Sequence, residues 1–143
     1  MRENVLISED KELLNLSLIH DFLSNESAWA KGISLQTVKT SVENSLCIGA
    51  YINNVQVGFC RVITDYATFA NLVDVIVWPK YRGQAISKLI MKSVIEHHKL
   101  VGIRRFTLAT TDAHGLYKQF GFNALNKPET FMERYDGNVY TRS

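Results

Sequence analysis

Hydrophobic and polar residues alternate along two neighbouring stretches in the middle of the chain. Apolar side chains occupy every second position from 46 to 52 and again from 55, in a run that extends to about 64. A period of two is typical of β-strands, and Asn53 and Asn54 between the runs tolerate the positive φ angles of a tight turn. The pattern therefore predicts a β-hairpin.

The other elements follow from changes in this period and from capping residues. Serines that precede apolar runs of helical spacing can cap two helices before the hairpin, and strand and helix patterns alternate after it. A hairpin followed by strand–helix units indicates one mixed α/β domain over residues 1–143. The predicted elements are a strand at 3–7, a helix from Ser8 to about Ser24, a loop at 25–32, a helix from Ser34 to about Asn44, a loop at 65–69, a central strand at 71–78, a helix ending near Leu100, a strand at 103–109, a helix at 112–120, weaker strands at 122–125 and 130–134, and a tail from about 136.

Composition places the chain among ordinary globular proteins. Of its 143 residues 46% are hydrophobic and 21% charged, which suits one domain with a substantial core. The net charge of +2 is too small to indicate nucleic acid or an anionic membrane as a partner. No run of about 20 apolar residues and no signal-peptide pattern is present. Cys47 and Cys60 lie in apolar runs without metal-ligand spacing, so we expect buried free thiols and a cytoplasmic protein.

Residues 73–90 combine features that favour anion binding. An apolar strand ends at Pro79, a short loop carries Arg82 and Gly83, and an amphipathic helix follows. The first backbone N–H groups of a helix have no partner within it, and the peptide dipoles place partial positive charge at that end. Neither a Walker loop nor the Gly-x-Gly-x-x-Gly dinucleotide pattern is present. The stretch is therefore a candidate phosphate site of another kind.

The segment from Pro79 to Ser87, Pro-Lys-Tyr-Arg-Gly-Gln-Ala-Ile-Ser, resembles the acetyl-CoA signature of the GNAT superfamily of acyl-CoA-dependent N-acetyltransferases. That signature is a strand, then Pro-x-(Tyr/Phe)-(Arg/Gln)-x-x-Gly-x-(Gly/Ala), then a helix. The resemblance implies acetyl-CoA as co-substrate, with its pyrophosphate bound by backbone N–H groups of the loop and helix start. It implies contacts to the pantetheine arm from Val75, Ile76 and Val77, and to the pyrophosphate from Arg82, Gly83, Gln84, Ala85, Ile86 and Ser87.

A second segment strengthens the resemblance. Residues 112–122 are similar to the family's Ala-x-x-Leu-Tyr-x-x-x-Gly-Phe segment. In the family this tyrosine lies near the thioester sulfur and can protonate the departing CoA thiolate, which makes Tyr117 the expected general acid. Thr110 stands where the family often has a cofactor-binding asparagine. The order of elements agrees over about residues 3–135, so the resemblance covers nearly the whole chain.

Two positions depart from the family pattern. Ala85 and Ser87 stand where the family prefers glycine. We expect both residues in helical φ and ψ, where neither is strained and both N–H groups stay available. Ser87 Oγ could also donate to a phosphate oxygen. The alternative for the whole stretch is a strand–turn–helix packing unit that binds nothing.

Asp74 is the one carboxylate inside the apolar central strand. A primary amine, with a pKa of about 10, must lose a proton before it attacks a thioester. Asp74 could accept that proton directly or through water, or it could instead pair structurally with a neighbour. Trp29, Tyr66 and Phe69 fall on loops that wall the acceptor pocket in the family, which implies substrate binding. No histidine or cysteine pair has ligand spacing, so no metal is expected.

These residues predict a single α/β (α+β) GNAT-like domain with a mixed, mostly antiparallel sheet, flanking helices and a splayed central strand pair. The expected reaction is acetyl transfer from acetyl-CoA to a primary amine of a small molecule, by direct attack in a ternary complex. The alternatives are a CoA-binding module with little transferase activity, a protein N-terminus or lysine acetyltransferase, and an interaction domain that binds no nucleotide. We expect no nucleic-acid or membrane partner, and a monomer or homodimer.

Overall fold

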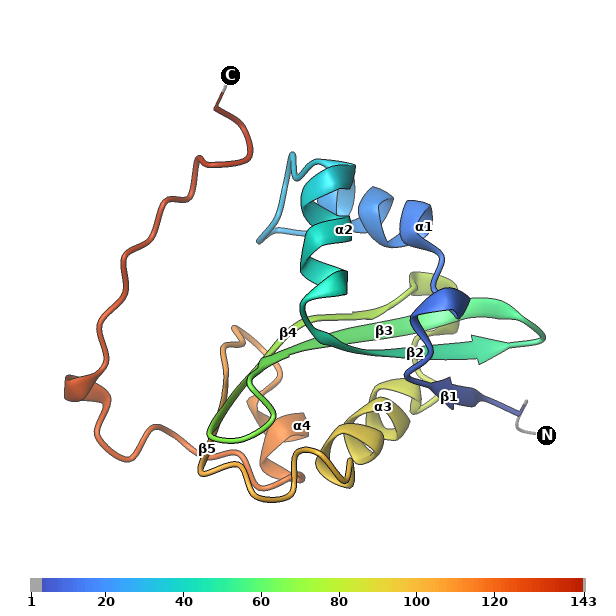
Figure 1. The fold of residues 1–143 in the computed structure, drawn as a ribbon. Coiled ribbons are helices and arrows are strands. Elements are labelled where there is room, and N and C mark those ends of the chain that lie inside the picture. The colour runs from blue at the N-terminus through green and yellow to red at the C-terminus, as the bar shows by residue number, and fades with distance from the viewer. Residues whose placement is uncertain (1–3, 143) are drawn as a thin grey trace.

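A computed structural model describes residues 4–142 and shows one five-stranded sheet with helices on both faces (Figure 1). Short helical turns connect several of the main elements. The strands are β1 (Leu6–Ser8), β2 (Leu46–Ile52), β3 (Val55–Thr64), β4 (Phe69–Val77) and β5 (Arg105–Leu108). The helices are α1 (Leu16–Asp21), α2 (Leu35–Glu43), α3 (Ile86–Ile95) and α4 (His114–Lys118), and the turns are η1 (Lys11–Leu13), η2 (Phe22–Glu26), η3 (Pro79–Tyr81) and η4 (Pro128–Thr130).

The strands follow one another across the sheet in chain order, from β1 at one edge to β5 at the other. Neighbours are antiparallel except β4 and β5, which run parallel because the chain returns through α3. Asn53 and Asn54 connect β2 to β3 with φ angles of 48° and 66°, which confirms the predicted hairpin and its turn. The mixed, mostly antiparallel sheet is likewise confirmed.

Alternation along the strands sends apolar side chains into two clusters, one on each face of the sheet. Phe59 and Ile76 belong to the cluster that includes Ile19 of α1 and residues of α2. Val62 belongs to the other cluster, which includes Ile90 and further residues of α3. The α1–α2 layer and α3 therefore cover opposite faces of the sheet (Figure 1).

β4 and β5 separate halfway along β4. Their pairing joins residues 69–72 to residues 105–108, whereas β4 continues to Val77. The register between β3 and β4 shifts at Phe59 to Arg61, and opposite this shift Asp74 has a φ of 52°. This irregularity is a β-bulge, which bends and twists the strand. The expected splay is present, and within residues 4–142 the β5 side of residues 73–77 has no partner strand.

The predicted helix from Ser8 to Ser24 is wrong in its start and in its regularity. Pairing with β2 keeps Ser8 extended as the last residue of β1. The helix α1 begins after Asn15, whose side chain accepts from the N–H of Leu18, and it changes to a π-helical turn at Phe22. Ser34 caps α2 as predicted. Glu3, expected in the first strand, lies outside the described residues.

The predictions for the C-terminal half also need correction. The helix α3 ends at Ile95 rather than near Leu100, because a turn follows in which the N–H of Lys99 donates to the His97 ring. The weaker strands at 122–125 and 130–134 are not formed, since neither segment pairs with another strand within residues 4–142. Instead residues 125–142, the C-terminal tail, form an arch that leaves the body after α4 and begins well before residue 136 (Figure 1). No helix of the described residues is long and apolar enough to cross a membrane.

Candidate functional site

A cleft of about 570 Å³ opens between the segment that follows α1 and the loop that joins β4 to α3. This volume is in the usual range for small-ligand pockets. Eight of the ten predicted cofactor-binding residues and the predicted substrate residue Trp29 line it together. The lining residues are Phe22, Glu26, Ser27, Ala28, Trp29, Val75, Ile76, Val77, Tyr81, Arg82, Gly83, Ala85, Ile86 and Ser87.

The loop between β4 and α3 has the backbone conformation of an anion site. Gly83 and Ala85 have φ angles of 82° and 62°, and α3 begins at the next residue, Ile86. Left-handed residues beside a helix start arrange successive N–H groups around a concavity that attracts anions. The N–H of Leu89 makes the first bond back to Ala85, so the N–H groups of residues 86–88 have no partner within α3.

Ala85 is not helical, contrary to the prediction. Its φ of 62° and ψ of 22° place it in the left-handed region, which costs a residue with a Cβ roughly 1–2 kcal/mol. The chain adopts this conformation where it turns from η3 into α3. Glycine adopts this left-handed conformation without strain, which accounts for the family preference for glycine noted at this position. Ser87 lies in the first turn of α3, where its expected helical conformation is confirmed.

The Arg82 side chain folds back along β4, and its Nε donates to the Val77 carbonyl oxygen at 2.9 Å. This bond fixes the loop on the end of the splayed strand. The remaining guanidinium nitrogens make no hydrogen bond within residues 4–142, so they keep donors for an anion. A Cβ added at Gly83 would meet no atom within 4 Å, so the loop has open space beside it.

Asp74 forms two hydrogen bonds that join separate parts of the molecule. Its Oδ1 accepts from the Trp29 indole Nε1 at 2.8 Å, and its Oδ2 accepts from Arg61 Nε at 3.0 Å. The Arg61 and Asp74 side chains are only 15% and 9% exposed, so the ion pair is largely removed from water. The structural alternative weighed for Asp74 is therefore observed, and its role as a base stays a prediction.

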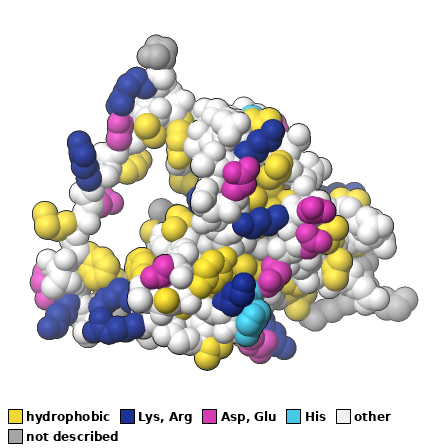
Figure 2. Space-filling model, in the orientation of Figure 1, with side chains coloured by type: hydrophobic (Ala, Val, Ile, Leu, Met, Phe, Trp, Pro, Cys, Tyr) yellow, Lys and Arg dark blue, Asp and Glu magenta, His cyan; other side chains and the backbone are white. Residues whose placement is uncertain are grey.

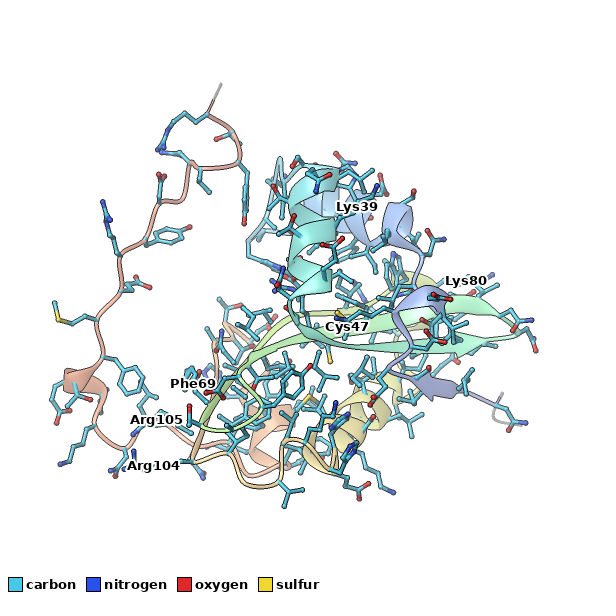
Figure 3. The ribbon with its side chains drawn as sticks, in the orientation of Figure 1. Lys39, Cys47, Phe69, Lys80, Arg104 and Arg105 are labelled. Carbon is cyan, nitrogen blue, oxygen red and sulfur yellow. The ribbon has the colours of Figure 1, made fainter. Side chains whose placement is uncertain are left out.

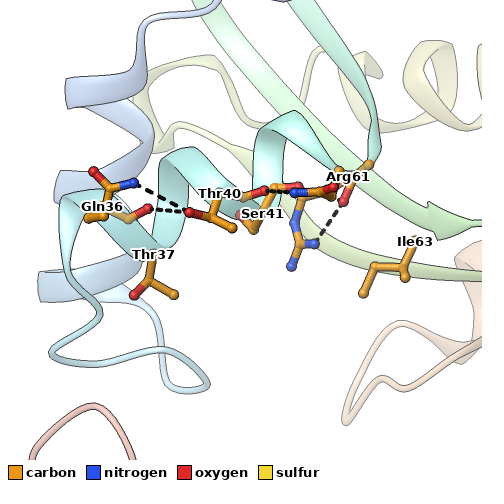
Figure 4. A pocket seen from close by; sticks show the side chains of 8 residues that line it. Gln36, Thr37, Thr40, Ser41, Arg61 and Ile63 are labelled. Carbon is orange, nitrogen blue, oxygen red and sulfur yellow. Dashed lines mark hydrogen bonds between the residues drawn. The ribbon is translucent and has the colours of Figure 1, made fainter.

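Arg61 connects this ion pair to a second cavity, of about 390 Å³, between α2 and β3 (Figure 4). We call it the α2 cavity. Arg61 Nη1 donates to Ser45 Oγ at 3.0 Å, and that hydroxyl donates to the Ser41 carbonyl oxygen. The α2 cavity is predominantly polar in its side chains, and its lining residues are Gln36, Thr37, Thr40, Ser41, Asn44, Ser45, Arg61 and Ile63.

Tyr117 lies in α4 with its ring packed into the cluster beneath α3. The centroids of the Tyr117 and Phe122 rings are 6.2 Å apart in an edge-on arrangement, and Tyr117 is 8% exposed. The Tyr117 hydroxyl makes no hydrogen bond within residues 4–142. It is nevertheless not among the buried, unpartnered polar atoms of these residues, where the Tyr51 hydroxyl stands alone, so the Tyr117 oxygen reaches solvent. Burial raises the pKa of the Tyr117 phenol above its ordinary value, which keeps it protonated at neutral pH.

The other predicted residues lie away from the cleft lining. Tyr66 lies in the β3–β4 connection and Phe69 is the first residue of β4, whereas the cleft is at the far end of β4, about 26 Å along a nine-residue strand. Figure 3 shows Phe69 beside Arg105 at that other end. Thr110 accepts from the N–H of Ala113 before α4, and Gln84 is exposed in the loop.

One residue with chemistry at the site, Arg61, was not assigned from sequence, whereas Glu26 is expected from the sequence to suit a cationic acceptor. Arg61 interrupts an apolar strand in the same way as Asp74, and this pair of opposite charges on adjacent predicted strands was a usable signal. Glu26 lines the cleft together with Trp29. Its position depends on the π-helical turn after α1, which no periodicity of the sequence indicates.

Comparisons with known proteins agree with this geometry. The family model described as "Acetyltransferase (GNAT) domain" matches residues 43–124, more than half of the chain. A crystal structure from Xanthomonas campestris pv. campestris, named as a candidate acetyltransferase of the GNAT family, is 46% identical, covers 99% of this chain and 100% of its own, and has a TM-score of 0.96. A candidate acetyltransferase from Gibberella zeae is 29% identical over 138 residues, which cover 81% of this chain and 77% of that protein.

A protein of unknown function from meticillin-resistant Staphylococcus aureus shares the fold alone. It is 23% identical, covers 93% of this chain and 99% of its own, and has a TM-score of 0.74. The overlay with the Xanthomonas structure is closer and extends to the C-terminal tail. That tail has 18 of the 143 residues, so a TM-score of 0.96 over 99% of the chain requires the two tails to follow similar paths.

Proposed function

Since the chain belongs to the GNAT acetyltransferase family, we propose that it transfers the acetyl group of acetyl-CoA to a primary amine of a small molecule. The observation that carries the proposal is the β4–α3 unit. A strand separated from its neighbour leads there into a loop with two left-handed residues and a ten-residue helix with free N–H groups.

The residues present suit acetyl-CoA, which supplies a reactive thioester when it is bound. The N–H groups of residues 86–88 and the free guanidinium nitrogens of Arg82 would hold the pyrophosphate. The backbone of residues 75–77, left unpaired on the β5 side, would hydrogen-bond the pantetheine amides. The open space at Gly83 leaves room for the nucleotide portion beside the loop.

The acceptor amine would enter from the side of Glu26 and Trp29. Glu26 provides a carboxylate for a cationic amine, and Trp29 provides a ring face held in place by Asp74. The cleft volume suits a small ligand, which favours a small-molecule amine over a folded protein surface. Loss of the amine proton then falls to Glu26, to Asp74 or to a water between them.

Direct transfer agrees with the state of the two cysteines. Both thiols are buried, and burial raises their pKa values, that of Cys47 to about 11, so neither is a thiolate at neutral pH. The amine nitrogen would therefore form its bond to the acetyl carbon as the carbon–sulfur bond breaks. Tyr117, with a protonated phenol, would give its proton to the departing sulfur.

One observation favours a CoA-binding module without transferase activity. Both oxygens of Asp74 accept structural hydrogen bonds from Trp29 and Arg61, so the carboxylate predicted as the base is already engaged. Release of free thiol from acetyl-CoA with a panel of small amines, peptides and lysine-containing proteins separates these functions. Amine-dependent thiol release supports the enzyme, and binding of acetyl-CoA without release from any acceptor would identify the module.

A further inference from the structure

The α2 cavity lies on the same face of the sheet as the cleft. Arg61 is two residues from Phe59 on β3, and Phe59 belongs to the apolar cluster beneath α1 and α2. The cavity volume of about 390 Å³ is in the range of small-ligand pockets. The cavity borders the opening that Figure 2 shows between the C-terminal tail and the body, so a ligand reaches it directly from solvent. The reaction proposed for the cleft does not occupy this cavity.

Arg61 is the only charged residue among the eight that line the cavity. A guanidinium has five N–H donors, and within residues 4–142 Arg61 uses Nε for Asp74 and Nη1 for Ser45. Nη2 has no partner there, but it is not buried, because the Tyr51 hydroxyl is the only buried side-chain atom of these residues that lacks a partner. Figure 4 shows the guanidinium between α2 and Ile63. Two bonds therefore fix a charged group whose remaining donors face the cavity.

The helix side of the cavity offers mainly hydrogen-bond acceptors. Polar residues at positions 37, 40, 41 and 44 recur at helical spacing and form one stripe along α2. The Thr40 hydroxyl donates to the Gln36 carbonyl oxygen, and the Ser41 hydroxyl donates to that of Val38. Their oxygens keep lone pairs for a ligand, as does the side-chain oxygen of Asn44, whose amide nitrogen donates to the Thr40 carbonyl. This wall suits a ligand that carries hydroxyl or N–H groups.

The donors of Arg61 suit a carboxylate. Guanidinium and carboxylate groups pair through short, charge-assisted hydrogen bonds, often two in parallel. No carboxylate lies among the lining residues to occupy Nη2. Asp74 already balances the charge of Arg61, so the preference comes from the oriented N–H donors, which a cationic group could not accept from. The cavity therefore fits a small polar molecule with one carboxylate and further hydrogen-bond donors.

Asp74 joins this cavity to the cleft. Its two oxygens bind Arg61 on one side and the Trp29 indole on the other, so a single carboxylate separates the cleft wall from the charged donors of the cavity. Along β4, Asp74 also directly precedes residues 75–77, which are proposed to hold the pantetheine arm. The two spaces thus meet at the end of the proposed donor site.

We propose that the acceptor is a small amino carboxylate that spans the two spaces. Its amine lies in the cleft with Trp29 and Glu26, and its carboxylate binds Arg61 in the α2 cavity. This substrate class rests on the proposed acetyl transfer and leaves the transfer itself unchanged. The amide bond forms as the carbon–sulfur bond breaks, and the product is an N-acetylated amino carboxylate.

Matched pairs of amines test the substrate class in the full-length protein. Serine and ethanolamine, β-alanine and ethylamine, and ornithine and putrescine differ within each pair only by a carboxylate. Thiol release from acetyl-CoA should give a kcat/KM at least tenfold higher for the preferred amino carboxylate than for its partner, because the carboxylate adds charge-assisted hydrogen bonds. The difference should lie mainly in KM, since these bonds form equally in the ground state and the transition state.

Two variants and a control locate this preference. Ser41→Leu fills part of the cavity without removing either partner of the Arg61–Asp74 ion pair. Arg61→Lys keeps a positive charge beside Asp74 but removes the planar set of donors. In each variant the ratio of kcat/KM within a pair should fall towards one. Lys39→Leu places the same apolar side chain on an exposed part of α2 outside the cavity lining, and it should keep the wild-type ratio.

Binding without acetyl-CoA separates failure of this substrate class from failure of acetyl transfer. In thermal shift, the preferred amino carboxylate should stabilise the wild type and Lys39→Leu more than its partner amine does, and Ser41→Leu should lose the difference. If that difference is seen but no amine releases thiol, acetyl transfer fails and the carboxylate site stands. Equal kcat/KM within every pair, or a preference that persists in both Ser41→Leu and Arg61→Lys, would overturn the substrate class while acetyl transfer stands. Neither thiol release nor carboxylate-dependent stabilisation would overturn both.

Discussion

Trp29 donates its indole N–H to Asp74 at 2.8 Å and thereby connects the segment after α1 to the bulged residue of β4. Both partners are unusual for their setting, since Trp29 is exposed and Asp74 has a φ of 52° inside a strand. The same carboxylate binds Arg61, which continues to Ser45 below α2. One side chain thus fixes a wall of the cleft, the bulge that splays β4 and the edge of the α2 cavity.

Asp74→Ala tests how much this connection stabilises the fold. The variant leaves Arg61 largely buried without its counter-charge, so we expect a loss of about 3–5 kcal/mol in the free energy of unfolding. Asp74→Asn keeps an oxygen for Trp29 and should lose less. Urea unfolding measures both. If Asp74 also acts as the base, the kcat of folded Asp74→Asn falls about 10²- to 10⁴-fold; a purely structural role leaves kcat nearly unchanged.

Ala85→Gly should stabilise the protein. Glycine adopts a φ of 62° without strain, so relief of the left-handed conformation is expected to outweigh the added freedom of the unfolded chain, by up to about 1 kcal/mol. Ala67→Gly is the matched control. Because Ala67 has a negative φ, this variant should lose about 0.4–1 kcal/mol in the free energy of unfolding. Thermal unfolding of both variants decides the sign. A destabilised Ala85→Gly would contradict the conformation of the loop.

The sheet could be predicted from the sequence because its signals are local. The Asn53–Asn54 turn, the Ser34 cap and the apolar runs each act over a few residues, and the structure has all of them. The errors arise where distant contacts decide. Pairing with β2 keeps Ser8 extended, and the β-bulge holds Asp74 with a positive φ beside Arg61. The strands expected at 122–125 and 130–134 did not form, because neither segment pairs with another strand within residues 4–142.

For the cleft, too, the residues marked by a local motif could be predicted from the sequence, and those positioned by the fold could not. The loop from Arg82 to Ser87 was located by its motif, and five of its six residues line the cleft together with residues 75–77 of β4. The left-handed state of Ala85 could not be inferred, because a helix start is compatible with several backbone paths. Tyr66 and Phe69 were assigned to the acceptor pocket by analogy, but the length of β4 separates them from it.

The buried thiols predict how the protein responds to alkaline pH. The folded pKa of Cys47 is raised by burial from 9.0 to about 11, so its stabilising contribution is complete below about pH 9 and is lost as the pH rises towards 11. The phenols of Tyr51 and Tyr117 shift in the same direction through burial. Urea unfolding between pH 8 and 11 should show falling stability, with a shallower slope in Cys47→Ala. A flat profile would contradict the burial of these groups.

Tyr117→Phe separates proton donation from packing. The ring stays in the core and the hydroxyl has no partner within residues 4–142, so stability should change little. If the phenol protonates the departing thiolate, kcat should fall by about 10- to 10⁴-fold at saturating acetyl-CoA. Tyr51→Phe, which removes a buried hydroxyl elsewhere in the sheet, is the control. Equal kcat values for wild type and Tyr117→Phe would remove the assigned role.

The donor site at the β4–α3 loop is tested most directly by acetyl-CoA binding to Gly83→Asp and Gly83→Asn. Both side chains tolerate a left-handed φ and enter open space, and they differ only in charge. Thermal shift should show wild type stabilised by about 2.7 kcal/mol at a ligand concentration of 100 Kd. Binding should be at least tenfold weaker for Gly83→Asp than for Gly83→Asn, because a carboxylate would face the pyrophosphate. Equal affinities for the two variants, or no stabilisation of the wild type, would contradict an acetyl-CoA site in this loop.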